Sequence, residues 1–258
     1  MSLPILHFDK YGDTGLPILI LHGLFGSGRN WTSIAKALSS SYQIFTVDAR
    51  NHGRSFHHPE HSISAMTQDL VRLLEFLKIN QCVLIGHSMG GLTSMRFTLL
   101  YPEKVLGLVV VDIAPRPYFI SYEAEFSALS VDLSPYHSRK EIDMALSQII
   151  PRSDIRQFLQ TNIERGEDGH FYWRLNVEAL KKAPNRADPE LPTHLVVTKK
   201  VVFFRSLHED FITEKDIPLI YHFFPRAEII DFHEGNHWLH ITEQEKFLQE
   251  TRRYLLQI

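Results

Sequence analysis

The residues best suited to chemistry lie in one short stretch, Gly86-His87-Ser88-Met89-Gly90, which fits the pattern Gly-x-Ser-x-Gly. The apolar run 82–85 before it has the length and composition of a strand, and residues 92–100 after it can form an apolar helical face. A strand and a helix on either side are typical of the nucleophile elbow, a tight turn that exposes a serine hydroxyl at the top of a sheet. Both glycines leave room for neighbouring backbone in such a turn. We therefore predict that Ser88 is a nucleophile.

A serine hydroxyl is a weak nucleophile until a base takes its proton. Of the 15 histidines, His237 is the candidate base, because it follows the last predicted strand, 228–231, in a glycine-bearing loop. That imidazole in turn needs a carboxylate to fix its tautomer and to stabilise its protonated form. In the chain order serine, acid, histidine, two residues qualify, Asp112 and Asp210. The residues alone leave both acids open.

Negative charge that develops on a carbonyl oxygen must meet hydrogen-bond donors that are already in place, usually two backbone N–H groups. One donor is expected at Met89, directly after the nucleophile. The other is expected in the loop after His22-Gly23, at Leu24. Both donors belong to the main chain, so their side chains need not be polar.

The elements that must position these residues alternate along the first half of the chain. Apolar runs at 16–21, 43–47, 82–85 and 105–111 predict strands, and the intervening segments predict helices, of which 66–77 has the clearest apolar spacing. Strands that are apolar throughout and alternate with helices predict a mostly parallel sheet covered on both faces. The first two apolar runs, 3–8 and 16–21, are separated by Gly and Asp and predict an opening hairpin.

After Pro115 the alternation stops, and about eighty residues follow without a convincing buried strand, which is far beyond an ordinary connection. Helices are expected at 119–129, 139–150 and 155–163. We interpret this region, approximately residues 116–190, as a helical cap inserted into a single domain that spans residues 1–258.

Composition limits the classes of partner. The net charge of −3 over 258 residues gives no reason to expect nucleic acid or an anionic membrane as a partner, and no apolar run is as long as a bilayer span. The first residues lack a basic segment followed by a long apolar core, so no secretory signal is visible and a cytoplasmic protein is expected. The single Cys82 lies in an apolar strand and is expected to be a core residue.

Four motifs in order resemble the α/β-hydrolase family over nearly the whole chain, from residue 16 to the C-terminus: His22-Gly23, Asp48-x-Arg50-x-x-Gly53-x-Ser55, Gly86-x-Ser88-x-Gly90 and Gly235-Asn236-His237-Trp238. Two further segments, Arg50-Asn51-His52-Gly53 and Val111-Asp112-Ile113-Ala114-Pro115, resemble the bacterial YbfF-type esterases and the related ABHD11-like hydrolases. The resemblance implies hydrolysis of an ester or thioester with no metal and no organic cofactor.

The narrower resemblance also bears on the acid, because in YbfF-type esterases the aspartate that corresponds to Asp112 serves in this role. The chain departs from the group at one point, where Ser206-Leu207 replaces the usual Gly-Gly in the loop that leads to Asp210. We therefore expect Asp112 as the acid, with Asp210 as the alternative. The expected reaction is cleavage of carboxylic esters, with short- to medium-chain acyl groups, through an acyl-serine intermediate.

Other functions are also compatible with parts of the sequence. The same triad serves acyl thioesterases and lactonases, and the fold alone does not choose between them. Gly23-x-x-Gly26-x-Gly28 followed by Asp48 resembles a dinucleotide site of an oxidoreductase, although the glycine spacing differs from Gly-x-Gly-x-x-Gly. A ligand receptor that keeps the hydrolase architecture without turnover is the third alternative.

Three features are expected to lie outside the chemistry. The segment 57–61, with three histidines around Pro59, is interpreted as a solvated turn rather than a metal site. Asp48 and Arg50 are expected to brace loops. The aromatic segment 171–173 either lines an acyl pocket or packs within the cap.

Overall fold

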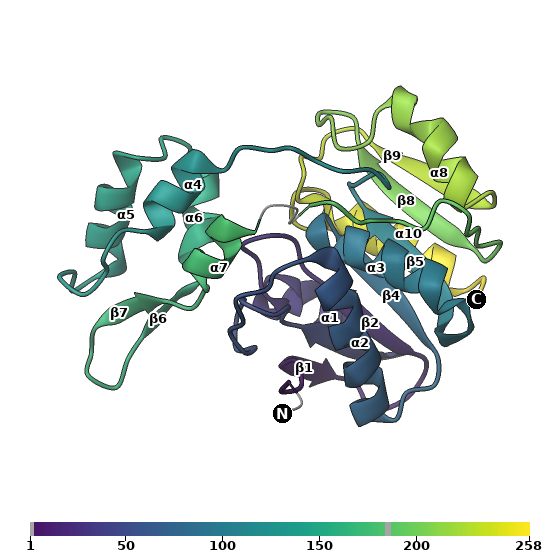
Figure 1. Ribbon diagram of the computed structural model, residues 1–258, viewed down its shortest axis with the longest axis horizontal. Helices are drawn as coiled ribbons and strands as arrows, with labels where there is room; N and C mark the ends of the chain where they lie inside the picture. Colours follow the sequence, from purple (N-terminus) through teal and green to yellow (C-terminus); the bar gives the residue numbers. More distant parts are fainter. Residues whose placement is uncertain (1–2, 184–186) are drawn as a thin grey trace.

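The structure, a computed structural model, describes residues 3–183 and 187–258 and is built around one seven-stranded sheet (Figure 1). The strands in spatial order are β1 (Phe8–Tyr11), β3 (Gln43–Val47), β2 (Pro17–Leu21), β4 (Cys82–His87), β5 (Val105–Val111), β8 (Val201–Ser206) and β9 (Ala227–Phe232). All neighbours pair in parallel except β1, which runs antiparallel to β3. The predicted mostly parallel sheet is confirmed.

The opening hairpin is a wrong prediction. β1 begins only at Phe8, and it pairs with β3, so that Phe8 lies opposite Val47. β2 pairs with β3 and β4 instead. The glycine turn at residues 12–15 therefore leads from β1 into β2, and β3 lies between these two strands in the sheet.

Helices cover both faces of the sheet because each central strand is apolar on both sides. On one face lie α2 (Ile63–Leu77), α3 (Met89–Leu100) and α8 (Ile217–Phe223), which follows a 3₁₀ turn at Glu214–Asp216. On the other face lie α1 (Thr32–Leu38), entered through a 3₁₀ turn at Gly28–Trp31, together with α9 (Leu239–Thr242) and α10 (Gln244–Leu255). A further 3₁₀ turn, Pro102–Lys104, precedes β5.

Local sequence explains where α2 begins and ends. The Ser62 hydroxyl accepts the Ala65 N–H at 3.1 Å and so caps the first turn. The helix buries Met66, Leu70 and Leu73 at helical spacing, as the sequence predicted. It ends where Lys78 adopts a left-handed conformation with a φ of 56°.

The segment formed by residues 123–182, between β5 and β8, lies to one side of the sheet (Figure 1). It contains α4 (Glu123–Leu129), α5 (Arg139–Ser147), α6 (Ser153–Gln160), the hairpin of β6 (Ile163–Arg165) and β7 (Phe171–Trp173), and α7 (Val177–Lys182). Residues 184–186 of the predicted cap lie outside the described residues. The segment has its own apolar cluster, to which the main domain contributes the buried side chain of Phe25. The aromatic segment 171–173 is thus the second strand of a hairpin that sequence periodicity did not predict.

Strand register brings the ends of the central strands to one edge. His87 on β4 pairs with Val111 on β5, so that Ser88 and Asp112 leave neighbouring strands at the same level. Ser206 on β8 pairs with Phe232 on β9, five residues before His237. Side chains from distant parts of the chain therefore meet at this edge. No helix in residues 3–183 and 187–258 combines the length and apolar character needed to cross a bilayer.

Candidate active site

Ser88 occupies a strained turn between β4 and α3. Its backbone has a φ of 51° and a ψ of −117°, a conformation that a residue with a side chain rarely adopts. The turn is possible because a Cβ on Gly86 would collide with the carbonyl oxygen of Gly90, and one on Gly90 would collide with that of Leu21. The Ser88 N–H donates to the Val111 carbonyl at 3.1 Å. The local geometry is that of a nucleophile elbow.

Asp112 and His237 meet although 125 residues separate them. Asp112 directly follows β5, and His237 lies in the loop after β9. The His237 Nδ1 donates to Asp112 Oδ2 at 2.9 Å, and the Asp112 side chain is fully buried while that of His237 is 17% exposed. Because the carboxylate can only accept, Nδ1 carries the proton and Nε2 is left as the basic nitrogen.

Asp210 lies elsewhere. It belongs to the loop after β8, and its side chain is exposed and makes no hydrogen bond or ion pair with other residues of the described chain. Its backbone carbonyl accepts a hydrogen bond from Arg116 Nη2 at 3.2 Å. The structure thus brings Asp112, and not the Asp210 side chain, to His237.

Ser206 contacts Asp112 through its backbone N–H. Its N–H donates to Asp112 Oδ1 at 2.9 Å, and its hydroxyl donates to the Gly235 carbonyl at 2.5 Å. Burial raises the pKa of Asp112, and the Ser206 N–H opposes this shift by stabilising the ionised carboxylate that His237 contacts. The sequence did not predict this contact. Any residue except proline offers the same backbone N–H, so no sequence motif marks the position.

A stacked ring and a backbone hydrogen bond hold His237 in place. The ring of Phe211 stacks on it with centroids 3.7 Å apart and an interplanar angle of 18°. His87 Nε2 donates to the His237 carbonyl at 2.8 Å, which ties the loop to the elbow strand. Burial lowers the pKa of His237 below its usual range, so the ring is neutral near pH 7. A neutral imidazole is the form that can accept a proton.

The two predicted oxyanion donors border the same space as Ser88. Within residues 3–183 and 187–258, the N–H groups of Leu24 and Met89 have no hydrogen-bond acceptor. The Gly23 carbonyl points away, since it accepts hydrogen bonds from His22 Nδ1 at 2.8 Å and from the Gly26 N–H at 3.0 Å. In a trans peptide the C=O and N–H directions are opposite, so the Leu24 N–H faces away from His22.

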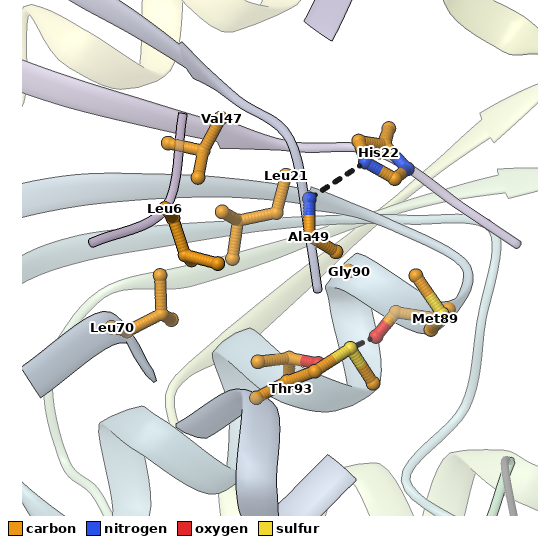
Figure 2. Close-up of a pocket in the computed structure, with 10 residues that line it drawn as sticks. Leu6, Leu21, His22, Val47, Ala49, Leu70, Met89, Gly90 and Thr93 are labelled. Atoms are coloured by element: carbon orange, nitrogen blue, oxygen red, sulfur yellow. Dashed lines mark hydrogen bonds between the residues drawn. The ribbon is translucent and has the colours of Figure 1, made fainter. Parts of the chain in front are cut away.

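His22 is itself fixed by a second contact. Its Nε2 accepts the Ala49 N–H at 3.0 Å, as Figure 2 shows, so the ring is neutral with its proton on Nδ1. Burial lowers the pKa of His22 and favours this neutral form. The ring also borders a small apolar cavity behind Met89, lined by Leu6, Leu21 and Leu70 among others (Figure 2).

A larger cavity is bordered by Ser88 and His237 on one side and by Tyr122, Ile155 and Phe158 of the segment between β5 and β8 on the other. Its apolar wall includes Leu24, Phe158 and Trp238, and charged side chains also border it. The charged residues are Glu125, Arg152 and Glu209. A concave, mainly apolar cavity with a few polar groups is typical of a small-molecule site.

Residues expected to act outside the chemistry have structural contacts. Asp48 accepts the Gly28 N–H at 2.7 Å and the Arg54 N–H at 2.8 Å, so its carboxylate braces two loops and is not presented to a ribose. His57 Nε2 lies 2.9 Å from the Arg174 carbonyl. Trp173 donates from its ring nitrogen to the Val131 carbonyl at 3.0 Å, and the segment 171–173 packs within the inserted segment rather than lining the large cavity.

Comparison with known proteins gives a consistent family. The family model described as the alpha/beta hydrolase fold matches residues 17–139. The sn-1-specific diacylglycerol lipase ABHD11 of Mus musculus is 37% identical, over 98% of this chain and 85% of the relative. Esterase YbfF of Escherichia coli K12 is 32% identical, over 93% of this chain and 92% of the relative.

A solved structure is also similar. The marine microorganism esterase superposes with a TM-score of 0.91 at 40% sequence identity, over 98% of this chain and all of that one. Similarity in sequence over nearly the full length and in fold, together with an elbow serine in the expected turn, leads to one conclusion. The chain belongs to the α/β-hydrolase family, in the group of ester-hydrolysing enzymes that includes ABHD11-like and YbfF-like members.

Proposed function

We propose that this protein hydrolyses carboxylic esters through an acyl-enzyme on Ser88, with His237 as general base and acid and Asp112 as the orienting carboxylate. The observation that carries the proposal is the 2.9 Å contact between His237 Nδ1 and the buried Asp112, at a cavity that also contains Ser88. Leu24 and Met89 supply the backbone donors for the oxyanion.

The steps follow from these roles. His237 Nε2 takes the proton of the Ser88 hydroxyl as its oxygen attacks the ester carbonyl, and the new oxyanion is held by the N–H groups of Leu24 and Met89. When the tetrahedral intermediate breaks down, the imidazolium returns the proton to the departing alcohol. A water molecule, activated by the same imidazole, then cleaves the acyl-serine and releases the carboxylic acid. Asp112 stabilises the imidazolium in both halves.

The cavity favours a particular orientation of the ester. The departing oxygen must lie near His237, which borders the large cavity. A second, small apolar space borders Ser88 and Met89 but not His237, and its walls include Leu92, Ile113 and Tyr118. We assign the acyl chain to this smaller space and the alcohol to the larger one. The limited apolar volume supports short- to medium-chain acyl groups.

Thioesters and lactones remain chemically possible substrates, because the triad is the same for all three. Turnover of a graded panel tests the assignment, namely p-nitrophenyl esters, acyl-CoA thioesters and lactones of matched acyl length. Diacylglycerol, the substrate in the name of the mouse relative, belongs in the panel as a large-alcohol ester. We expect the highest kcat/KM for esters with short or medium acyl chains. A preference for thioesters or lactones at matched acyl length would contradict the ester assignment.

Covalent labelling tests the nucleophile. A fluorophosphonate should attach once to the native protein at Ser88, and Ser88→Ala should abolish both labelling and turnover while leaving the thermal unfolding unchanged. Residual activity from the oxyanion donors alone is expected at about one-thousandth of wild type or less. A native protein that neither labels nor turns over an aryl acetate would instead be a ligand receptor with a hydrolase fold.

A further inference from the structure

The backbone that presents Leu24 is held at the next residue, Phe25. The Phe25 N–H donates to His52 Nε2 at 3.2 Å, and the Phe25 carbonyl accepts a hydrogen bond from Asn162 Nδ2 at 2.7 Å. Phe25 has a φ of 62°, in the left-handed region that a bulky residue rarely adopts. Such a conformation persists only when surrounding contacts fix it. His52 and Asn162 supply these contacts on opposite sides of the residue.

The protonation state of His52 follows from its neighbours. Its Nδ1 lies 2.9 Å from the Arg50 carbonyl, which can only accept, so the proton is on Nδ1 and Nε2 presents a lone pair to Phe25. The side chain is fully buried. Burial is the main cause that lowers the pKa of His52 well below its usual value, which favours the neutral ring that this contact requires.

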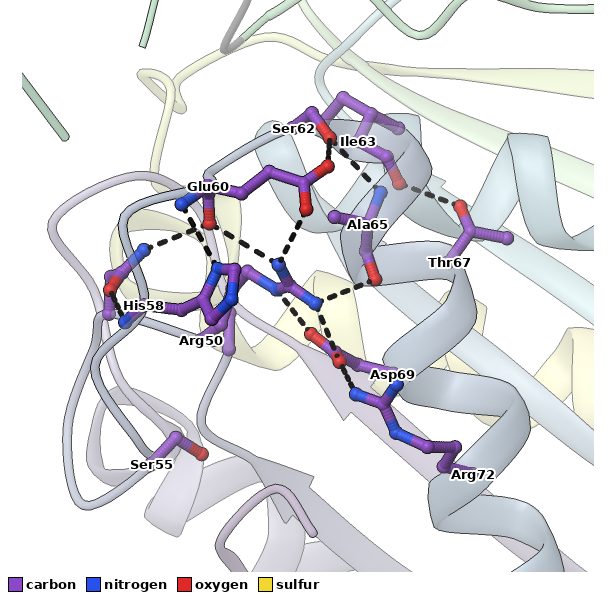
Figure 3. A network of polar contacts seen from close by, with 12 residues as sticks. Arg50, Ser55, His58, Glu60, Ser62, Ile63, Ala65, Thr67, Asp69 and Arg72 are labelled. Atoms are coloured by element: carbon purple, nitrogen blue, oxygen red, sulfur yellow. Dashed lines mark hydrogen bonds and ion pairs between the residues drawn. The ribbon is translucent and has the colours of Figure 1, made fainter. Parts of the chain in front are cut away.

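Arg50 gives His52 a fixed support. The Arg50 side chain is 2% exposed, and its guanidinium donates to Asp69 through Nε at 2.6 Å and through Nη2 at 2.8 Å. Nη2 also donates to the Ala65 carbonyl at 3.2 Å, on the first turn of α2 (Figure 3). A bidentate ion pair inside the protein restricts both partners. The Arg50 carbonyl that holds His52 is therefore attached to a rigid part of the domain.

We propose that His52 is a positioning residue that aims the Leu24 N–H at the oxyanion by holding the following peptide group through the Phe25 N–H. The inference rests on the proposed ester hydrolysis and deepens it. His22 orients the Gly23–Leu24 peptide through the Gly23 carbonyl, and His52 orients the Leu24–Phe25 peptide. With both peptides fixed, the backbone torsions of Leu24 are set before substrate binds. Oxyanion donors act through such preorganisation.

Two substitutions separate positioning from packing. Glutamine places a side-chain oxygen near the position of the imidazole Nε2, whereas asparagine reaches only the position of Nδ1. His52→Gln should therefore keep the acceptor for the Phe25 N–H and hold kcat within about fivefold of wild type, whereas His52→Asn should lower kcat by about 10- to 100-fold. KM for a p-nitrophenyl ester should change little in both variants. A trifluoromethyl ketone, which forms an oxyanion on Ser88, should bind His52→Asn more weakly by the same factor as the loss of kcat/KM.

His58→Ala is the matched control, because asparagine would keep an acceptor near the Nδ1 position that His58 uses. His58 lies in the same loop and accepts the Glu60 N–H at 3.0 Å, a backbone contact of the same kind that does not involve the residues around Leu24. Its kcat should stay within about twofold of wild type, because no oxyanion donor moves. If His52→Asn does not fold, His52→Gln decides alone: loss of kcat in a variant with a cooperative thermal transition would overturn the proposal.

The other outcomes distinguish a failure of this inference from a failure of the proposed function. Equal losses of kcat in His52→Gln and His52→Asn, or a loss confined to KM, would show that His52 acts through packing and would overturn the inference. Turnover that survives Ser88→Ala would instead overturn the proposed function itself. Measuring all variants on one aryl ester keeps the two failures distinct.

Discussion

The backbone N–H of Ser206 donates to Asp112 Oδ1 at 2.9 Å, while the other carboxylate oxygen accepts from His237. The contact fixes the orientation of the carboxylate from the neighbouring strand, at the position where the family resemblance leads one to expect glycine. The Ser206 hydroxyl extends the link to the Gly235 carbonyl, two residues before His237. Ser206 thus connects Asp112 to the loop that carries His237.

This arrangement predicts a small effect of the Ser206 side chain. Ser206→Gly and Ser206→Ala both keep the N–H that supports Asp112. They remove only the two contacts of the hydroxyl, which donates to the Gly235 carbonyl and accepts the His208 N–H at 3.2 Å. Each is a neutral hydrogen bond with a net value of about 1 kcal/mol. We expect kcat to stay within about tenfold of wild type, with a modest fall in thermal stability. Steady-state kinetics and thermal unfolding check this. A loss as large as that of Asp112→Asn would mean that the hydroxyl, not the N–H, supports the acid.

The two aspartates should differ sharply. Asp112→Asn removes the carboxylate that holds the His237 tautomer and should lower kcat on the order of 10⁴-fold with little change in KM. Asp210→Asn is the matched control, since its exposed side chain makes no ion pair in the described parts of the chain, and it should keep kcat within about threefold. Steady-state kinetics on one ester compares them. A crippled Asp210→Asn beside a mild Asp112→Asn would reverse the assignment.

The pH profile should report the free base. His237 must be neutral to take the Ser88 proton, and burial lowers the pKa of His237 below its ordinary value of 6.5. Activity is then present above the folded-state pKa and lost as pH falls through it, so kcat/KM should decline on the acid side below pH 6.5. The measurement is kcat/KM of a pH-insensitive aryl ester between pH 4 and pH 8. A profile that rises only above pH 7.5 would contradict a buried neutral base.

The acyl assignment predicts a shift in chain-length preference. Leu92 is 1% exposed and borders the smaller apolar space, so Leu92→Ala should enlarge it. We expect the ratio of kcat/KM for octanoate over butyrate esters to rise about tenfold. The change should also cost about 2–5 kcal/mol in the free energy of unfolding.

Leu70→Ala controls for this loss of packing. Leu70 is similarly buried but borders the separate cavity behind Met89 (Figure 2). In Leu70→Ala, the ratio of kcat/KM for octanoate over butyrate esters should therefore stay that of wild type. Denaturant unfolding and an ester series measure both effects. An unchanged ratio in Leu92→Ala would place the acyl chain elsewhere.

Local sequence was sufficient for the elements that depend on neighbouring residues. The parallel strands, the helix predicted at 66–77 and the turn at Ser88 follow from apolar spacing and from glycines without which the turn cannot close. These constraints act within a few residues, so a single sequence reveals them. The sheet prediction failed at β1, whose partner β3 lies beyond β2 in the chain, because pairing between distant strands leaves no local pattern.

The tertiary structure alone brought Asp112 rather than the Asp210 side chain to His237 and added the contacts of Ser206, His52 and Asn162. Motif resemblance favoured Asp112, but the residues themselves placed both aspartates after a strand. The outcome depends on the register of β4, β5, β8 and β9 and on the path of the loop after β9. Register is set by packing across the whole sheet, so contacts over a hundred residues apart in sequence could be identified only once the chain was folded.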